Sequence, residues 1–215
     1  MADPIELRLI EDTLSGGSVM PLPPLNRVLY LVHGAATVAG VDLTDDTAWQ
    51  GRAAIVTAGA SGAAIWRYEL APAGSQAWLG AGAGVRSSPK LAVALDTLPA
   101  GELLMRCDSV SFPPGGCAFR HVHQGPGIRC LIEGGIRIDT DGHSIAYGPG
   151  GAWFEAGPIP VFAQAAIDRP SRFIRVMVLP RALLGQSSIR YVDAADRDKP
   201  KTQTYKGYVD APIDP

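Results

Sequence analysis

The stretch GGCAFRHVHQGPGIRCLIEGG, residues 115–135, indicates both the fold and the chemistry of this chain. Two histidines, His121 and His123, stand one residue apart, and a turn rich in glycine and proline separates them from the apolar run GIRCLIE. Glycine and proline favour turns, whereas the run after them has the composition of a strand. The stretch therefore predicts two β-strands joined by a turn, with a pair of imidazoles on the first strand.

Similar strand-like runs recur along the whole chain, among them RVLYLVHG, GAAIWRYEL, LLMRCDSVSF and SRFIRVMVL. Most are short, rich in β-branched or aromatic residues, and end at glycine, proline or aspartate. The chain contains 25 glycines and 18 prolines, which punctuate the runs. This pattern predicts an all-β protein, either a sandwich or a barrel.

Composition limits the classes of function. The 215 residues are 47% apolar and 19% charged, with a net charge of −2, which predicts a folded globular protein without an electrostatic footprint for nucleic acid. No apolar run reaches the length of a membrane-spanning helix. The N-terminal MADPIELRLIEDTL carries early acids and no long apolar core, which argues against a signal peptide and predicts a cytoplasmic protein.

A weak repeat divides the chain. With an offset of about 100 residues, Gly34 matches Gly134 and Leu31 matches Leu131, each within a strand-like run. We therefore expect two β-units, residues 1–100 and 101–180, with the junction in LDTLPAGELL. The polar stretch 181–215 is expected to be an arm, either loosely attached or packed on a barrel or a neighbouring subunit.

The segments FPPGGCAFRHVHQGPGIRCLIEGGIRI and GHSIAYGPGGAWFEAGPIPVFAQA resemble the two motifs of the cupin superfamily. The resemblance runs from about residue 102 to 179, and residues 25–70 resemble a second, more divergent copy. It implies a bicupin with two jelly-roll β-barrels whose motif residues line the barrel interiors, and a homodimer. The superfamily includes dioxygenases, isomerases, lyases and binding proteins, so the resemblance predicts the fold more narrowly than the function.

The departures from the cupin pattern bear on the metal site. Cupins usually bind a divalent metal through the two histidines, a glutamate a few residues later, and a histidine in the second motif. Here the glutamate position falls at Gly127 and the last histidine position at or near Val161. In the N-terminal copy the corresponding positions carry no ligand, since they hold Pro21, Pro23 and Arg27.

The two remaining histidines can still share an ion. Residues i and i+2 of a strand point to the same face, about 6.6 Å apart along it. Neutral imidazoles suit Fe, Mn, Ni, Cu or Zn, but a lasting site normally needs three or four protein ligands. The sequence leaves open whether His121 and His123 bind a metal. Four side chains are candidates for the missing ligand: Glu69, Glu102, Glu155 and Gln164.

Arg129 is the candidate substrate-binding residue. If strand alternation continues past the turn, its side chain shares the pocket face with His121 and His123, where a guanidinium would repel a cation but grip a carboxylate. The alternative is that the turn changes the register and Arg129 is a surface residue. Arg172 and Arg175 lie on opposite faces of one strand, so at most one of them points inward, and both are interpreted first as surface charges. Glu155 is interpreted as a turn-edge charge before a ligand, and Trp153 as packing in the barrel wall.

Two classes of function follow. In the first, the C-terminal barrel is a metal-dependent oxygenase, isomerase or lyase that acts on a small organic compound, either carboxylated or not. In the second, the metal site has degenerated. The protein is then a metal-free small-molecule-binding or regulatory bicupin, or a metal-independent isomerase or lyase that uses a histidine as acid and base. The sequence contains no nucleophile-elbow, phosphate-loop or dinucleotide fingerprint that would favour another class. It names no catalytic residue.

Overall fold

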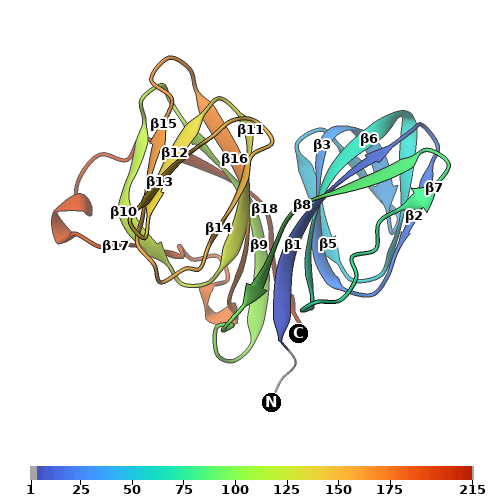
Figure 1. The fold of residues 1–215 in the computed structure, drawn as a ribbon, viewed down its shortest axis with the longest axis horizontal. Coiled ribbons are helices and arrows are strands. Elements are labelled where there is room, and N and C mark those ends of the chain that lie inside the picture. Colours follow the sequence, from blue (N-terminus) through green and yellow to red (C-terminus); the bar gives the residue numbers. More distant parts are fainter. Residues whose placement is uncertain (1–3, 215) are drawn as a thin grey trace. The chain divides into compact units, whose positions relative to one another are not determined.

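The computed structural model describes residues 4–214, which form 18 β-strands and two short 3-10 helices. All strand pairs are antiparallel, and the strands divide between two compact units. The first unit extends to Asp96 and includes Asp214, and the second comprises Thr97–Ile213. Each unit encloses its own core (Figure 1). The all-β prediction is confirmed.

The first unit is built from one eight-stranded sheet. Its strand order is β4-β3-β6-β1-β8-β7, with β2 paired to β6 and β5 paired to β3. The long strands β3 and β6 bend at bulges, so that a single sheet can curve around the core. The strands are β1 (Ile5–Leu14), β2 (Val19–Leu22), β3 (Asn26–Val38), β4 (Val41–Thr44), β5 (Thr47–Gly51), β6 (Ala54–Pro72), β7 (Ala81–Gly82) and β8 (Val85–Leu95).

The second unit consists of two five-stranded sheets, with strand orders β13-β12-β15-β10-β17 and β14-β11-β16-β9-β18. The strands are β9 (Leu103–Phe112), β10 (Cys117–His123), β11 (Gly127–Glu133), β12 (Ile136–Thr140), β13 (His143–Tyr147), β14 (Ala152–Glu155), β15 (Val161–Ala165), β16 (Ser171–Pro180), β17 (Ile189–Tyr191) and β18 (Thr204–Ile213). The 3-10 helices are Arg181–Leu183 and Ala194–Asp196.

Residues after Arg181 belong to the sheets of the second unit. Strand β17 pairs with β10, the strand that carries the two histidines, and β18 pairs with β9 in the other sheet. The second unit therefore extends to Ile213, whereas the change in sequence pattern had predicted that the barrel ends at residue 180. The stretch that reads as a polar arm supplies an edge strand to each sheet.

Aromatic and aliphatic side chains fill the core of the second unit. Trp153 stacks on Tyr147 at a ring-centroid distance of 5.0 Å and meets Phe173 edge-on at 5.1 Å. The interpretation of Trp153 as wall packing is confirmed, since its side chain is buried. The buried members of this core come from both sheets: Val110, Phe112, Ala118, Leu131, Ile136, Ile138, Trp153, Val161, Ala163, Ala165 and Phe173.

The matched glycines share one backbone feature. Gly34 and Gly134 both have positive φ, 95° and 84°, a region that L side chains rarely adopt. A Cβ at either position would lie 2.2 Å from a backbone oxygen, that of Gly62 or of Pro170. Glycine is therefore required at both positions, which explains why the offset of 100 residues is visible in the sequence.

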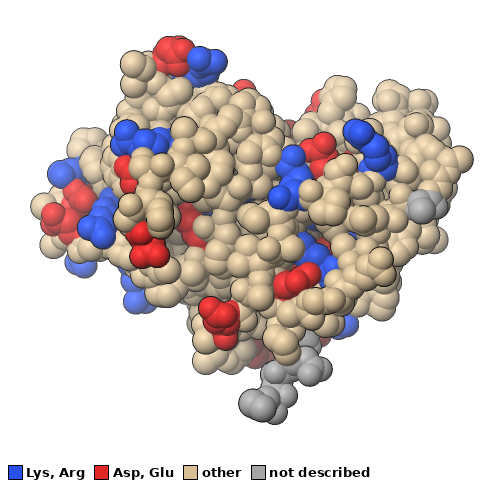
Figure 2. All heavy atoms as spheres, in the orientation of Figure 1, with Lys and Arg blue, Asp and Glu red and all other residues tan. Residues whose placement is uncertain are grey.

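Figure 2 shows lysine, arginine, aspartate and glutamate intermixed over the visible face, with no large patch of one sign. Within residues 4–214, no helix is long and apolar enough to cross a membrane.

Candidate metal centre

Strand β10 turns both histidines of the HxH motif toward the interior of the second unit. His121 and His123 are 5% and 4% exposed, while Val122 between them points the other way along the strand. Their Nε2 atoms lie 3.2 Å apart. The two imidazoles can therefore act on the same ion or water molecule.

Hydrogen bonds at the other ring nitrogens set the orientation of these imidazoles. His121 Nδ1 lies 2.7 Å from the carbonyl oxygen of Phe119, which can only accept, so Nδ1 carries the proton and Nε2 presents a lone pair. His123 Nδ1 lies 3.4 Å from the hydroxyl oxygen of Ser188, which can accept a hydrogen bond from Nδ1–H in the same way. With both Nδ1 atoms protonated, two Nε2 lone pairs face each other at 3.2 Å, and a cation between them would stabilise this arrangement.

Glu155 is the third donor. Its Oε2 lies 3.6 Å from His123 Nε2, and the ligand atoms of the three side chains all lie within 4.8 Å of one another. Trp153 Nε1 donates to the other carboxylate oxygen at 2.9 Å and holds it in place. The interpretation of Glu155 as a turn-edge charge was wrong, because its side chain is only 8% exposed and faces the histidines.

The register of the sheets explains how Glu155 comes to this position. Glu155 on β14 is paired directly with Gly127 on β11, the position where the cupin pattern has its glutamate. A Cβ at Gly127 would lie 2.5 Å from the carbonyl oxygen of Val176, so that position has no room for a side chain. The carboxylate is therefore supplied from the neighbouring strand.

The remaining candidate ligands lie elsewhere. Val161, at the position of the last cupin histidine, is paired with His121 and offers no donor atom. Glu69 is buried in the first unit with Arg27 and Arg67. Glu102 forms an exposed ion pair with Arg181, and Gln164 donates to backbone oxygens of the loop before β10.

Arg129 lies in the same interior as the histidines. It is 1% exposed, and its Nη2 lies 2.8 Å from Glu155 Oε2 while its Nη1 donates to the carbonyl oxygen of Gly127 at 2.7 Å. Strand alternation thus continues past the turn, as one of the two sequence interpretations required. The guanidinium contacts the carboxylate that completes the three-donor group.

A second arginine lies beside this group. Arg175 on β16 is 7% exposed and binds both carboxylate oxygens of Asp108 on β9, at 2.9 and 2.7 Å. The interpretation of Arg175 as a surface charge was wrong, because its strand is central in the sheet and its partner is on the adjacent strand. Arg172, three residues earlier, is half-buried and pairs with Glu133.

Two cavities meet at this site. A small one of about 20 Å³, enough for one water molecule or one ion, is lined by His121, His123, Arg129, Glu155 and Arg175 together with apolar core residues. A larger one of about 480 Å³ lies beside it and is wide enough for a small organic molecule. Arg175, Ile189 and Tyr205 line both cavities.

The environment keeps both histidines neutral. Burial lowers the pKa of His121 below its usual value, although the Glu155 carboxylate opposes this. Burial lowers the pKa of His123 well below its usual value, and the positive charges of Arg129 and Arg175 act in the same direction. The contact between His123 and Glu155 is therefore not an ion pair at neutral pH, and both imidazoles are in the form that binds metals.

This shift predicts how stability depends on pH. In the metal-free protein, the unfolded chain binds more protons than the folded chain below the ordinary histidine pKa of about 6.5. The free energy of unfolding is therefore expected to fall as the pH decreases from 7 to 5, by up to about 1.4 kcal/mol per pH unit for each histidine. Urea unfolding of chelator-treated protein across this range measures the slope.

Matched variants identify the source of this slope. His123→Asn is expected to reduce the slope and leave the part that is due to His121. His143→Asn, at an exposed position, is expected to leave the profile unchanged. A wild-type profile that is flat between pH 7 and 5 would show that the histidine pKa values are not lowered.

The three donors fit a single metal ion. The two Nε2 atoms, 3.2 Å apart, are close enough that both would bind one ion. One carboxylate and two imidazoles form a donor set that suits several first-row divalent metals. Three protein ligands leave at least one coordination position for water or substrate.

No protein-family model matches the chain, and no curated protein sequence matches it. Its structure resembles oxalate decarboxylase from Bacillus subtilis, with a TM-score of 0.59, 13% identity, and coverage of 82% of this chain and 69% of that one. It also resembles salicylate 1,2-dioxygenase from Pseudoaminobacter salicylatoxidans, with a TM-score of 0.54, 11% identity, and coverage of 80% and 68%. Both are proteins of the cupin fold, so the likeness shows that this chain has that fold.

Proposed function

We propose that the second unit of this cupin-fold chain binds one divalent metal ion through His121, His123 and Glu155. In this proposal the protein is an enzyme of the oxygenase, isomerase or lyase class that acts on a small organic molecule bound in the adjoining 480 Å³ pocket. The observation that carries the proposal is the convergence of three donor atoms within 4.8 Å of one another around a buried cavity. Nitrogen and carboxylate donors that converge in this way are typical of metal centres.

The chain's own residues have defined roles in such a site. A bound ion would supply Lewis acidity, which polarises an oxygen atom of the substrate. Phe119 and Ser188 orient the two imidazoles, while Arg129 and Trp153 orient the Glu155 carboxylate. The apolar walls of the small cavity exclude bulk water and strengthen these electrostatic interactions.

The structural neighbours support this choice of reaction class. By name, one is a decarboxylase of oxalate and the other a dioxygenase of salicylate. Both names describe enzymes that act on small molecules, and the pocket of this chain has a suitable volume.

A metal-free binding protein is the second candidate. The observation that favours it is the ion pair between Arg129 and Glu155, which already neutralises the carboxylate without any cation. Such a site binds a divalent ion only if the attraction of the ion to the carboxylate and the imidazoles exceeds its repulsion by the guanidinium. Metal content therefore separates the two candidates.

In this proposal the first unit is a second cupin barrel with a structural role only. Its buried charged side chains include a connected group in the interior, formed by Arg27, Arg67, Asp12 and Glu69. Arg67 binds both oxygens of Asp12, at 2.6 and 3.0 Å, and both arginines contact Glu69. Because the carboxylates are held by guanidinium groups, they are poorly placed to bind a cation.

Glu155→Gln tests the proposal. We expect this change to weaken metal binding by roughly tenfold or more, because it removes the only anionic donor of the three. The measurement is metal affinity by competition with a chromogenic chelator, with metal content determined by elemental analysis. Glu102→Gln, which removes an exposed carboxylate paired with Arg181, is the matched control and is expected to leave affinity unchanged. Equal affinities for wild type and Glu155→Gln would exclude Glu155 as a ligand.

A further inference from the structure

We propose that the pocket beside the three-donor group binds a carboxylate, and that Arg175 is the residue that holds it. The inference rests on the proposed function and deepens it, because it names the substrate class for the same site and a residue that determines specificity.

The two cavities place Arg175 between the pocket and the histidines. Arg175, Ile189 and Tyr205 line both the 480 Å³ pocket and the small cavity that contains His121 and His123. A molecule in the pocket therefore reaches the three-donor group past these side chains. The ring of Tyr205 lies over the Arg175 guanidinium, with its centroid 5.9 Å from Cζ, and restricts the plane of that group.

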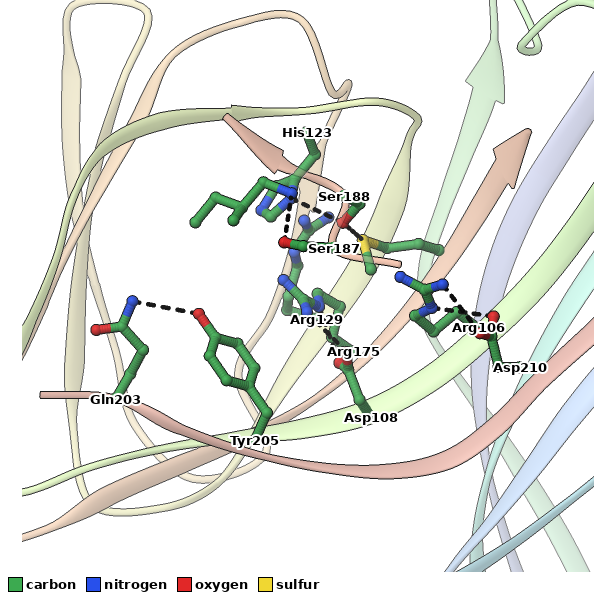
Figure 3. A network of polar contacts seen from close by, with 12 residues as sticks. Arg106, Asp108, His123, Arg129, Arg175, Ser187, Ser188, Gln203, Tyr205 and Asp210 are labelled. Atoms are coloured by element: carbon green, nitrogen blue, oxygen red, sulfur yellow. Dashed lines mark hydrogen bonds and ion pairs between the residues drawn. The ribbon is translucent and has the colours of Figure 1, made fainter. Parts of the chain in front are cut away.

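Arg175 retains donors that it does not use on the chain. Its Nε and Nη2 donate to the two oxygens of Asp108 (Figure 3). Within residues 4–214, its Nη1 donates no hydrogen bond. A guanidinium has five N–H groups, so the edge formed by Nη1 and Nη2 can still bind both oxygens of a carboxylate. This free edge is where the carboxylate would bind.

Arg106, which lines the same pocket, lacks such an edge. Its Nε and Nη2 bind Asp210 at 3.0 Å each, its Nη1 donates to the carbonyl oxygen of Gln186 at 2.7 Å, and its Nη2 also donates to that of Leu183 at 2.6 Å. Every nitrogen of Arg106 is thus engaged with the chain. Arg106 fixes the segment before β17 and serves as a matched comparison for Arg175.

The charge of the site favours an anion. Arg129 pairs with Glu155 and Arg175 pairs with Asp108, so these four side chains are neutral together. A divalent ion would leave an excess of two positive charges in a buried place, which a bound anion would reduce. A carboxylate fits better than a phosphate, because Asp108 and Asp210 also line the pocket and would repel a dianion more strongly.

Binding of carboxylates and their neutral amides tests the inference. Benzoate and acetate, both monoanions, are compared with benzamide and acetamide by isothermal titration calorimetry, on metal-loaded and metal-free protein, with inorganic phosphate as a further probe. We expect at least one carboxylate to bind roughly tenfold or more tightly than its amide, and more tightly than phosphate. The proposal is overturned if each carboxylate binds no more tightly than its amide, or if neither carboxylate binds. If phosphate binds more tightly than both carboxylates, the pocket is a phosphate site and the proposal is likewise overturned.

Paired variants test the role of Arg175. The double variant Arg175→Gln, Asp108→Asn removes the guanidinium without leaving a buried charge, and it is expected to weaken carboxylate binding roughly 10- to 100-fold while amide binding changes little. Arg106→Gln with Asp210→Asn is the control and is expected to change carboxylate binding less than about threefold. Equal losses in the two double variants would mean that the pocket responds only to overall charge, and Arg175 would then not be the anchor.

If the double variant does not fold, Arg175→Lys tests the role of the Arg175 guanidinium instead. It keeps the positive charge beside Asp108 but has no planar edge, so we expect a loss of roughly tenfold in carboxylate affinity. Unchanged affinity would overturn the proposal.

The same experiments separate this inference from the proposed function. Protein that binds carboxylates through Arg175 but retains no metal would contradict the metal-dependent enzyme and leave the carboxylate site standing. Protein that retains metal but does not prefer carboxylates would contradict the carboxylate site and leave the metal centre standing.

Discussion

Replacement of both His121 and His123 by alanine is expected to lower the metal content from about one equivalent per chain to less than about a tenth. The two imidazoles contribute two of the three donor atoms, and their Nε2 atoms lie close enough to share one ion. A single carboxylate, already paired with Arg129, cannot hold a first-row metal by itself. Elemental analysis for Fe, Mn, Ni, Cu and Zn on protein purified without a histidine tag measures the effect.

His143→Ala is the control for this experiment, because His143 is exposed and lies outside the three-donor group. Its metal content is expected to equal that of the wild type. Circular dichroism on all variants distinguishes loss of ligands from loss of fold. Wild-type metal content in a folded double variant would exclude the proposed centre, and a wild type that neither retains nor takes up metal would favour the metal-free candidate.

The largest effect on stability is expected in the first unit. Asp12→Ala removes the carboxylate that binds Arg67 through two hydrogen bonds, in a pair whose side chains are both completely buried. The guanidinium would keep its contacts with Glu69 and the Trp78 carbonyl oxygen but would lose its main counter-charge. Breaking a buried pair in this way typically costs about 3–5 kcal/mol of stability. Chemical denaturation followed by tryptophan fluorescence measures the cost, because Trp78 lies against Arg67.

Asp42→Ala is the matched control on the surface of the same unit. Asp42 is exposed and accepts a hydrogen bond from the Thr37 hydroxyl at 2.7 Å. Its removal is expected to cost less than about 1 kcal/mol. A loss of similar size in both variants would mean that the buried network does not stabilise the unit.

The sequence predicts the strands and one half of the site for a simple reason. Short runs of β-branched and aromatic residues between glycines and prolines are a local signal, and alternation along β10 places His121 and His123 on one face. Gly34 and Gly134 mark positions where no other residue fits, so they persist as a visible offset. These features depend only on neighbours along the chain.

The third donor and the second arginine depend on pairing between strands. Glu155 reaches the histidines because β14 pairs with β11 in a register that sets it opposite Gly127, and no spacing in the sequence encodes that register. The dipeptide of Trp153 and Phe154 before it, with the glycines around it, indicates only a strand end near a turn. Arg175 likewise becomes a buried group because Asp108 lies directly across from it on β9, 67 residues earlier in the chain.

The sequence by itself determined the all-β architecture and the pair of imidazoles on one strand face. Only the tertiary structure decided that Glu155 completes a three-donor group, that Arg129 faces this carboxylate, and that Arg175 stands where the outer pocket meets it. The physical reason is that strand propensity and alternation act over a few residues. Burial, counter-charges and cavities arise instead where distant strands meet, and the energy of a charged side chain depends on which partners that meeting provides.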